Sequence, residues 1–147
     1  MPAFNKFHQF VADRAFMAKL RLVLAELARP GGQRDDWFGW AAGQAAHVAI
    51  GVVLAGALLF FLPPIGAFFA AALGYAALKE VPDFASAPSW ATARDSTQDA
   101  LFVAAGAALA VALAGGHDRL FAVALGAAVV GLGLGVWARL ARKGNVS

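Results

Sequence analysis

Long apolar runs alternate with short polar breaks along most of the chain. The breaks carry residues that end helices or form turns, namely Pro63-Pro64, Pro82 and Gly115-Gly116. A helix needs about 20 predominantly apolar residues to cross the hydrocarbon of a bilayer, and the longest run reaches that length. The pattern predicts an all-α membrane protein with four transmembrane helices. The predicted spans cover residues 41–62, 65–81, 99–114 and 120–138.

The first 36 residues follow a different pattern. Residues 4–29 lack Pro and Gly, and their apolar side chains recur at helical spacing with basic residues between them. A basic amphipathic helix with aromatic residues on its apolar side is expected to lie in the headgroup plane. The alternative is a helix docked on a partner protein or on the ends of the spans. We therefore expect an amphipathic cytoplasmic-face helix and hinge in residues 1–36, followed by a four-helix transmembrane domain in residues 37–147.

Composition supports burial in lipid. Of the 147 residues, 61% are hydrophobic and 14% are charged, and a single soluble core of this size does not hide so much apolar surface. The net charge of +3 is not gathered into one basic patch interleaved with aromatic residues, so no nucleic-acid partner is expected. Membrane lipid is the expected partner, together with a second copy of the chain or another membrane protein. The absence of cysteine excludes disulfides and thiolate chemistry.

Charge predicts the orientation in the membrane. With four spans, the amino terminus, the loop after the second span and the carboxyl tail share one side. Basic residues are concentrated there, and Arg119 alone lies on the other side. This imbalance predicts a multi-pass protein of the bacterial inner membrane with both termini in the cytoplasm. The basic residues on the predicted cytoplasmic side are Lys6, Arg14, Lys19, Arg21, Arg29, Arg34, Lys79, Arg94, Arg139, Arg142 and Lys143.

The third span begins with a helix-start signal in the sequence. Ser96 is followed three residues later by Asp99, and Asp95 is followed in the same way by Gln98, just before an apolar run. This spacing is typical of a capping box. It predicts that Asp99 lies in the first turn of the third span, and Pro82 predicts that Glu80 lies in the last turn of the second.

These positions bring ionisable residues to one end of the predicted bundle. Acids and bases inside or beside spans are costly unless they are paired or solvated, so their clustering indicates a site. The candidate site at the cytoplasmic rim consists of His47, Glu80, Asp83, Arg94 and Asp99. One histidine with several carboxylates suits a hard or borderline divalent metal ion, although the spacing matches no fixed metal signature.

Each member of this set also has a structural interpretation. Lys79 is typical of a lysine that extends toward the interface, and Asp95 and Asp99 are typical of helix-capping acids. His47 shares one helical face with Trp40 and Gln44, and a hydrogen bond to Gln44 would satisfy its ring. A lock of ion pairs that holds the helices together is an alternative to chemistry.

The order of these residues resembles that in the VanZ-like and YfiM-like bacterial membrane proteins. The shared elements are a histidine in one span, Lys-Glu-x-x-Asp closing the next, and Arg-Asp-Ser-Thr-x-Asp before a small-residue helix, over about residues 43–114. The resemblance implies that His47, Glu80, Asp83, Arg94 and Asp99 correspond to the polar positions of those families. It also implies an association with the cell envelope. It departs from the VanZ-like pattern at Asp83, where glutamine is more usual.

Two functional hypotheses follow. In the first, the protein is a small inner-membrane protein whose polar site acts on or senses a lipid-linked or cell-envelope component. In the second, it is a non-enzymatic helical subunit, or a holin-like assembly protein of a bacterium or phage, whose charges lock the packing of the helices. Signatures of P-loop, Rossmann and serine-hydrolase chemistry are absent from the sequence.

Overall fold

The computed structural model describes residues 36–144, with side chains as far as Arg142. The amphipathic helix predicted over residues 4–29 and most of the hinge lie outside this range. The described chain forms four long helical segments, and no strand occurs between residues 36 and 144. These segments are α3 (Trp37–Leu58), a second segment made of α4 (Pro64–Tyr75), η1 (Ala76–Glu80) and α5 (Val81–Ser86), then α6 (Trp90–Gly115) and α7 (Asp118–Gly144).

All four segments are long and apolar enough to cross a membrane. The fold class predicted from the sequence is therefore confirmed for the described part of the chain. Large apolar side chains also cover the outside of these helices, which is the expected surface for a multi-pass membrane protein in contact with lipid. Among the most exposed are Val53, Phe60, Phe61, Leu78, Val123 and Trp137.

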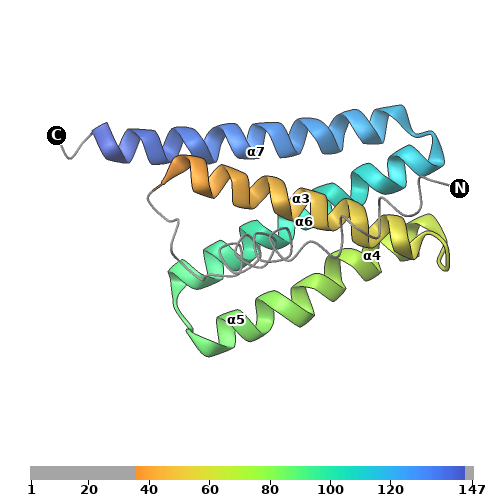
Figure 1. Ribbon diagram of the computed structural model, residues 1–147, viewed down its shortest axis with the longest axis horizontal. Coiled ribbons are helices and arrows are strands. Elements are labelled where there is room, and N and C mark those ends of the chain that lie inside the picture. The colour runs from red at the N-terminus through yellow and green to blue at the C-terminus, as the bar shows by residue number, and fades with distance from the viewer. Residues whose placement is uncertain (1–35, 145–147) are drawn as a thin grey trace, which may run out of the picture. The chain divides into compact units, whose positions relative to one another are not determined.

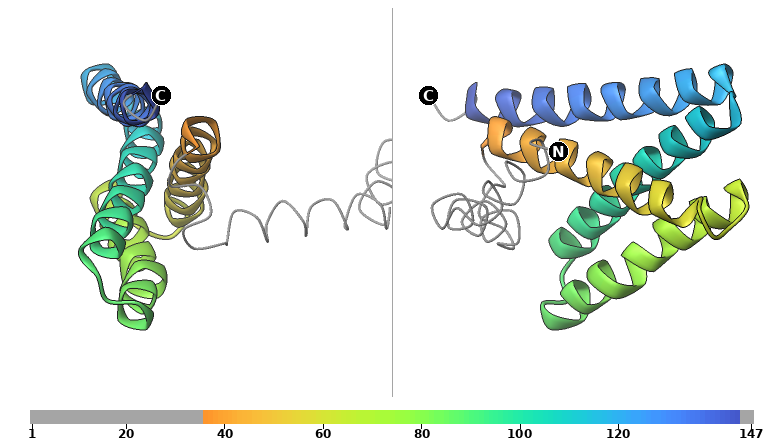
Figure 2. Two further views of the ribbon diagram at one scale, coloured as in Figure 1. Left: turned by 90° about the vertical axis from the view of Figure 1, so that its left-hand side faces the viewer. Right: turned by 45° about the vertical axis from the view of Figure 1, so that its right-hand side comes forward.

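Helix α6 lies at the centre of the packing. It contacts α3, the second segment and α7, while α7 contacts only α6 and α3 to a substantial extent. Figure 1 shows α6 behind α3, with α7 along one side and α4 and α5 along the other. The two views of Figure 2 show the same order from other directions. The start of α3, the end of α5, the start of α6 and the end of α7 lie at one end of this bundle (Figure 1).

Two glycines set the distance between α3 and α6. A Cβ atom on Gly51 would lie 2.0 Å from the backbone oxygen of Val103, and one on Gly106 would lie 2.0 Å from the backbone oxygen of Val48. Neither position has room for any side chain. The two glycines therefore let the backbones approach closely, as small residues do at helix contacts in membranes. We call this pair, Gly51 and Gly106, the glycine contact.

The sequence predicted that the second segment would end at Pro82, and this prediction was wrong. It continues to Ser86 through the π-helical turn η1, in which the amide of Val81 bonds to the carbonyl of Ala76. Proline has no N–H group and its ring obstructs the carbonyl four residues earlier, so an ordinary helix would be broken there. The wider π-helical turn directly before Pro82 accommodates the proline, and Glu80 is therefore not in the last turn.

The start of the third segment was also predicted wrongly. Helix α6 begins at Trp90, and the Oγ atom of Ser89 accepts a hydrogen bond of 3.1 Å from the amide of Thr92. No Pro or Gly interrupts residues 90–105, so the polar turns before Asp99 continue the apolar helix instead of forming a loop. Asp99 is the tenth residue of α6 and caps nothing. The resemblance of Ser96 and Asp99 to a capping box was misleading.

Candidate functional site

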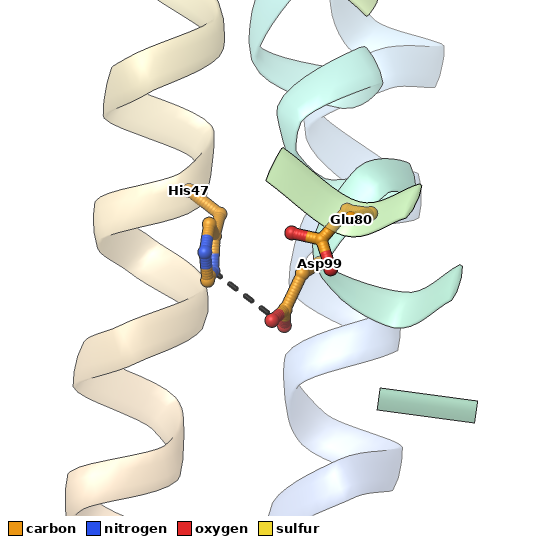
Figure 3. A group of neighbouring side chains, drawn as sticks. All are labelled: His47, Glu80 and Asp99. Carbon is orange, nitrogen blue, oxygen red and sulfur yellow. Dashed lines mark ion pairs between the residues drawn. The ribbon is translucent and has the colours of Figure 1, made fainter. Parts of the chain in front are cut away.

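Three ionisable side chains from three different segments meet inside the described bundle. They are His47 from α3, Glu80 from η1 and Asp99 from α6, which we call the polar cluster (Figure 3). Each can offer one ligand atom such that these atoms all lie within 4.8 Å of one another. The sequence placed these residues near the same end of the bundle, and the structure brings their side chains together.

Asp99 is held from the α3 side. The Nε2 atom of Gln44 donates a hydrogen bond of 2.8 Å to Oδ1 of Asp99. Nδ1 of His47 lies 3.6 Å from the same oxygen, which is an ion-pair distance but too long for a hydrogen bond. Gln44 and His47 stand one turn apart on the same face of α3, because residues three and four apart on a helix are neighbours.

Glu80 is the most deeply buried member, with 6% of its surface exposed. It reaches the cluster from the π-helical turn, a local change of winding that occurs often at functional positions. The hydroxyl group of Tyr75 lies beside the Glu80 carboxylate. The ring of Tyr75 also packs edge to face against the ring of His47, with centroids 5.8 Å apart. Tyr75 thus touches both Glu80 and His47.

Several buried polar atoms in this region are not satisfied within residues 36–144. They are Oε1 of Gln44, Nδ1 of His47 and Oε1 of Glu80, none of which has a hydrogen-bond partner among the described residues. Leaving a buried polar atom unpaired costs about 1–3 kcal/mol. Three such atoms around one point are therefore a cost that simple helix packing does not explain.

Two of the predicted site residues lie elsewhere. Asp83 forms an ion pair with Lys79 one turn earlier on the second segment, and both side chains are partly exposed. Exposed pairs of this kind contribute at most about 1 kcal/mol. Arg94 is exposed on the polar first turns of α6 and is not a member of the cluster. Both residues belong to the surface at this end of the described bundle.

The polar cluster lies more than two helical turns from the ends at which α3 and α6 begin. Asp99 follows the start of α6 by nine residues, or about 14 Å at 1.5 Å per residue, and His47 follows the start of α3 by ten residues, or about 15 Å. At Asp99 the polar first turns of α6 give way to an apolar stretch that continues to Gly115. The polar cluster therefore lies where the sequence of the central helix changes from polar to apolar.

Sequence reasoning missed two features near the polar cluster. The contact of Tyr75 with Glu80 and His47 carried a signal, since Tyr75 is the one tyrosine of the chain and stands five residues before Glu80. The second feature is Arg139, which is buried on α7 and lies 4.0 Å above the ring of Trp40 on α3. The sequence suggested that Arg139 helps to set the orientation in the membrane. The spacing of residues in the sequence does not show that Arg139 stacks on Trp40.

Comparison with known proteins assigns neither a family nor a function to this chain. No protein-family model matches the chain, and neither a curated protein nor a solved structure matches it significantly. The resemblance to VanZ-like and YfiM-like proteins therefore stays a prediction. The four apolar helices are those of a small multi-pass membrane protein, and the polar cluster is its candidate site.

Proposed function

We propose that this membrane protein uses the polar cluster to act on or sense a lipid-linked or cell-envelope component. The observation that carries the proposal is the unpaired Oε1 atom of the buried Glu80 beside two partly exposed groups. The side chains of His47 and Asp99 are 18% and 23% exposed, so a ligand can reach them. A buried acceptor with an accessible approach is typical of a binding site.

The position of the polar cluster favours a lipid-linked ligand. The change from polar to apolar residues along α6 at Asp99 is the pattern expected near the boundary between headgroups and hydrocarbon. A ligand with a polar head and an apolar tail fits such a boundary, because its head would meet the cluster while its tail stays in lipid. The resemblance to VanZ-like and YfiM-like proteins supports the bacterial inner membrane and the envelope as the setting.

The same groups suit proton transfer if the component is transformed. With no metal ion on Nδ1, the imidazole of His47 is the candidate general base, and Asp99 lies close enough to orient its ring. Gln44 holds Asp99 through a hydrogen bond of 2.8 Å, so the position of the acid is itself fixed.

The proposal is tested by the lipids that copurify with the full-length protein. Lipids extracted from wild type and from His47→Ala, Glu80→Gln and Asp99→Asn are compared by mass spectrometry. Asp118→Asn serves as the matched control, because Asp118 is an exposed acid at the start of α7. We expect one phosphate-bearing lipid to be enriched with wild type and control and to be reduced at least tenfold with the three variants. Identical lipid profiles in all five proteins would contradict the proposal.

A second candidate function has its own support. The contacts of Gln44 and His47 with Asp99 join α3 to α6, as a structural lock would. In that case the protein is a non-enzymatic subunit or a holin-like assembly protein. The same variants separate the two candidates, because a lock predicts loss of folding or assembly before any change in bound lipid. Size-exclusion chromatography and circular dichroism of each variant measure this directly.

The orientation belongs to the proposal as well. With both termini in the cytoplasm, the basic residues Arg139 and Arg142 lie toward the cytoplasmic end of α7, in accordance with the positive-inside rule. A reporter active only in the cytoplasm and fused after Ser147 is expected to be active. The same reporter inserted at His117, between α6 and α7, is expected to be inactive. The reverse result would overturn the orientation.

A further inference from the structure

We infer that the polar cluster binds one divalent metal ion, with His47, Glu80 and Asp99 as its protein ligands. This inference rests on the proposed function, because it names a ligand for that same site. It was only a general chemical expectation from the sequence. The structure supplies the distances, the burial and the unpaired atoms that argue for it.

The separations within the cluster suit a shared ion. Zinc binds nitrogen and oxygen ligands at about 2.0–2.2 Å, so two ligands at a tetrahedral angle lie about 3.4 Å apart and two on opposite sides about 4.2 Å apart. Nδ1 of His47 and Oδ1 of Asp99 are 3.6 Å apart, and the three ligand atoms lie within 4.8 Å of one another. The pair of His47 and Asp99 is thus already close to the tetrahedral spacing, and the widest pair would have to close by at most about 1.4 Å to reach it.

The unpaired atoms point to the same ligand. Nδ1 of His47 and Oε1 of Glu80 lack hydrogen-bond partners among residues 36–144, although Glu80 is more than nine-tenths buried. Oε1 of Glu80 carries a lone pair, and Nδ1 of His47 carries one in the tautomer protonated at Nε2, so both atoms can bind a metal ion. A cation bound to them would relieve the cost of two buried acceptors and would also reduce the repulsion between the carboxylates of Glu80 and Asp99.

The residues around the polar cluster act as a supporting layer. Gln44 donates a hydrogen bond to Oδ1 of Asp99, and the hydroxyl group of Tyr75 lies beside Glu80. Metal-binding carboxylates are commonly oriented by such bonds, which also limit their rotation. Oε1 of Gln44 is buried and has no partner among the described residues, so it is available to a water molecule on the ion.

The ligand set indicates which ions fit. One imidazole and two carboxylates form a mixed nitrogen and oxygen set, which suits Zn²⁺ or Mn²⁺. Because the chain has no cysteine, metal sites that depend on thiolate ligands are excluded. Three protein ligands leave at least one coordination position open, as in catalytic zinc sites. In the proposed function, that position is where a phosphate group on a lipid would bind.

The test uses full-length protein that has been stripped of metal with a chelator in detergent micelles. Dialysis against ZnCl₂ followed by elemental analysis is expected to give one Zn²⁺ per chain for wild type and for the control Asp118→Asn. Changes in groups that only orient metal ligands weaken binding by about 10–100-fold. We therefore expect Glu80→Gln and Asp99→Asn, which alter the ligands themselves, to bind Zn²⁺ at least about 100-fold more weakly.

X-ray absorption on the wild-type complex decides the matter even if a variant fails to fold. We expect one imidazole nitrogen and otherwise oxygen ligands around the zinc. Absence of stoichiometric binding by wild type, equal binding by wild type and Glu80→Gln, or a spectrum without imidazole would overturn the inference. Loss of metal binding with selective lipid binding retained would remove this inference alone. Metal binding without selective lipid would instead remove the proposed function.

Discussion

Helices α3 and α6 touch in two places that differ in almost every respect. At the glycine contact, Gly51 and Gly106 bring backbone against backbone and leave no room for a Cβ atom. One to two turns away, Gln44 and His47 meet Asp99 through polar side chains, with buried atoms left unpaired. Both places join the same pair of helices. Only the first does so with complementary packing.

We propose that the difference separates the residues that hold the bundle together from those that bind a ligand. Lipid provides no hydrophobic driving force between helices, so close packing of small residues stabilises their association. Polar contacts between membrane helices contribute only about 0.6 kcal/mol on average. The glycine contact is therefore expected to hold α3 against α6, and the polar cluster is expected to contribute little to stability.

The largest effect is expected at the glycine contact. In Gly51→Ala the new Cβ atom meets the backbone oxygen of Val103, which cannot move aside like a flexible side chain. We expect a loss of about 3 kcal/mol in the free energy of unfolding, measured by denaturant titration in micelles. The matched control is Gly56→Ala on the same helix, where a Cβ atom meets nothing within 4 Å. The control should be as stable as wild type or up to about 1 kcal/mol more stable.

A smaller effect is expected where α7 meets α3. A Cβ atom on Gly135 would lie 1.9 Å from the ring of Trp40, which also contacts Arg139. Because this ring can tilt, Gly135→Ala should cost about 1–2 kcal/mol. Gly133→Ala, with open space at its Cβ position, is the control for the same titration. Equal stability of the two variants would show that α7 is free to shift on α3.

An effect of similar size is expected at the start of α3, where neither contact is touched. Asp36 accepts hydrogen bonds from the amides of Phe38 and Gly39, at 3.3 and 2.8 Å. Asp36→Ala removes this cap and should cost about 1 kcal/mol. Asp36→Ser keeps a capping oxygen and should recover most of the loss. If Asp36→Ser is as unstable as Asp36→Ala, the cap is not the cause.

The smallest effect on stability is expected at the polar cluster itself. Asp99→Asn keeps an oxygen for the hydrogen bond from Gln44 but removes a charge from the cluster. We expect a change below about 1 kcal/mol in the free energy of unfolding, with a large loss of ligand binding. A denaturant titration measures the free energy of unfolding, and a metal-binding assay measures the loss of ligand. A loss of stability comparable to that of Gly51→Ala would favour the structural lock.

The sequence was sufficient for the number of helices because apolar run length is a local property. It failed at Pro82 and at Trp90, where a π-helical turn and the Ser89 cap decide the helix boundaries. The rule that a proline ends a helix does not allow for a π-helical turn directly before the proline. The predicted starts and ends were therefore misplaced by several residues near the polar cluster.

Part of the polar cluster was accessible to sequence reasoning. The sequence grouped His47, Glu80 and Asp99, because alternating passage through the membrane brings the helix ends near these residues to one side. Asp83 and Arg94 were grouped with them on the same argument, although the structure places both at the surface. Proximity to one end of the bundle does not fix the direction of a side chain.

The glycine contact was not predicted either. The sequence contains two glycine pairs spaced four residues apart, Gly39 with Gly43 and Gly131 with Gly135. Gly131 and Gly135 face the rings of Phe102 and Trp40 within the same chain. In a chain this rich in small residues, only the helix arrangement shows which glycine meets a backbone.

We propose that the polar cluster serves a ligand and is not needed to hold the helices together. The most direct measurement is the free energy of unfolding of the triple variant His47→Gln/Glu80→Gln/Asp99→Asn, which retains polar side chains of similar size and removes the ionisable groups. We expect the triple variant to fold with a free energy of unfolding within about 1 kcal/mol of wild type. A loss of more than about 3 kcal/mol, as expected when a buried ion-pair network is essential, would contradict it.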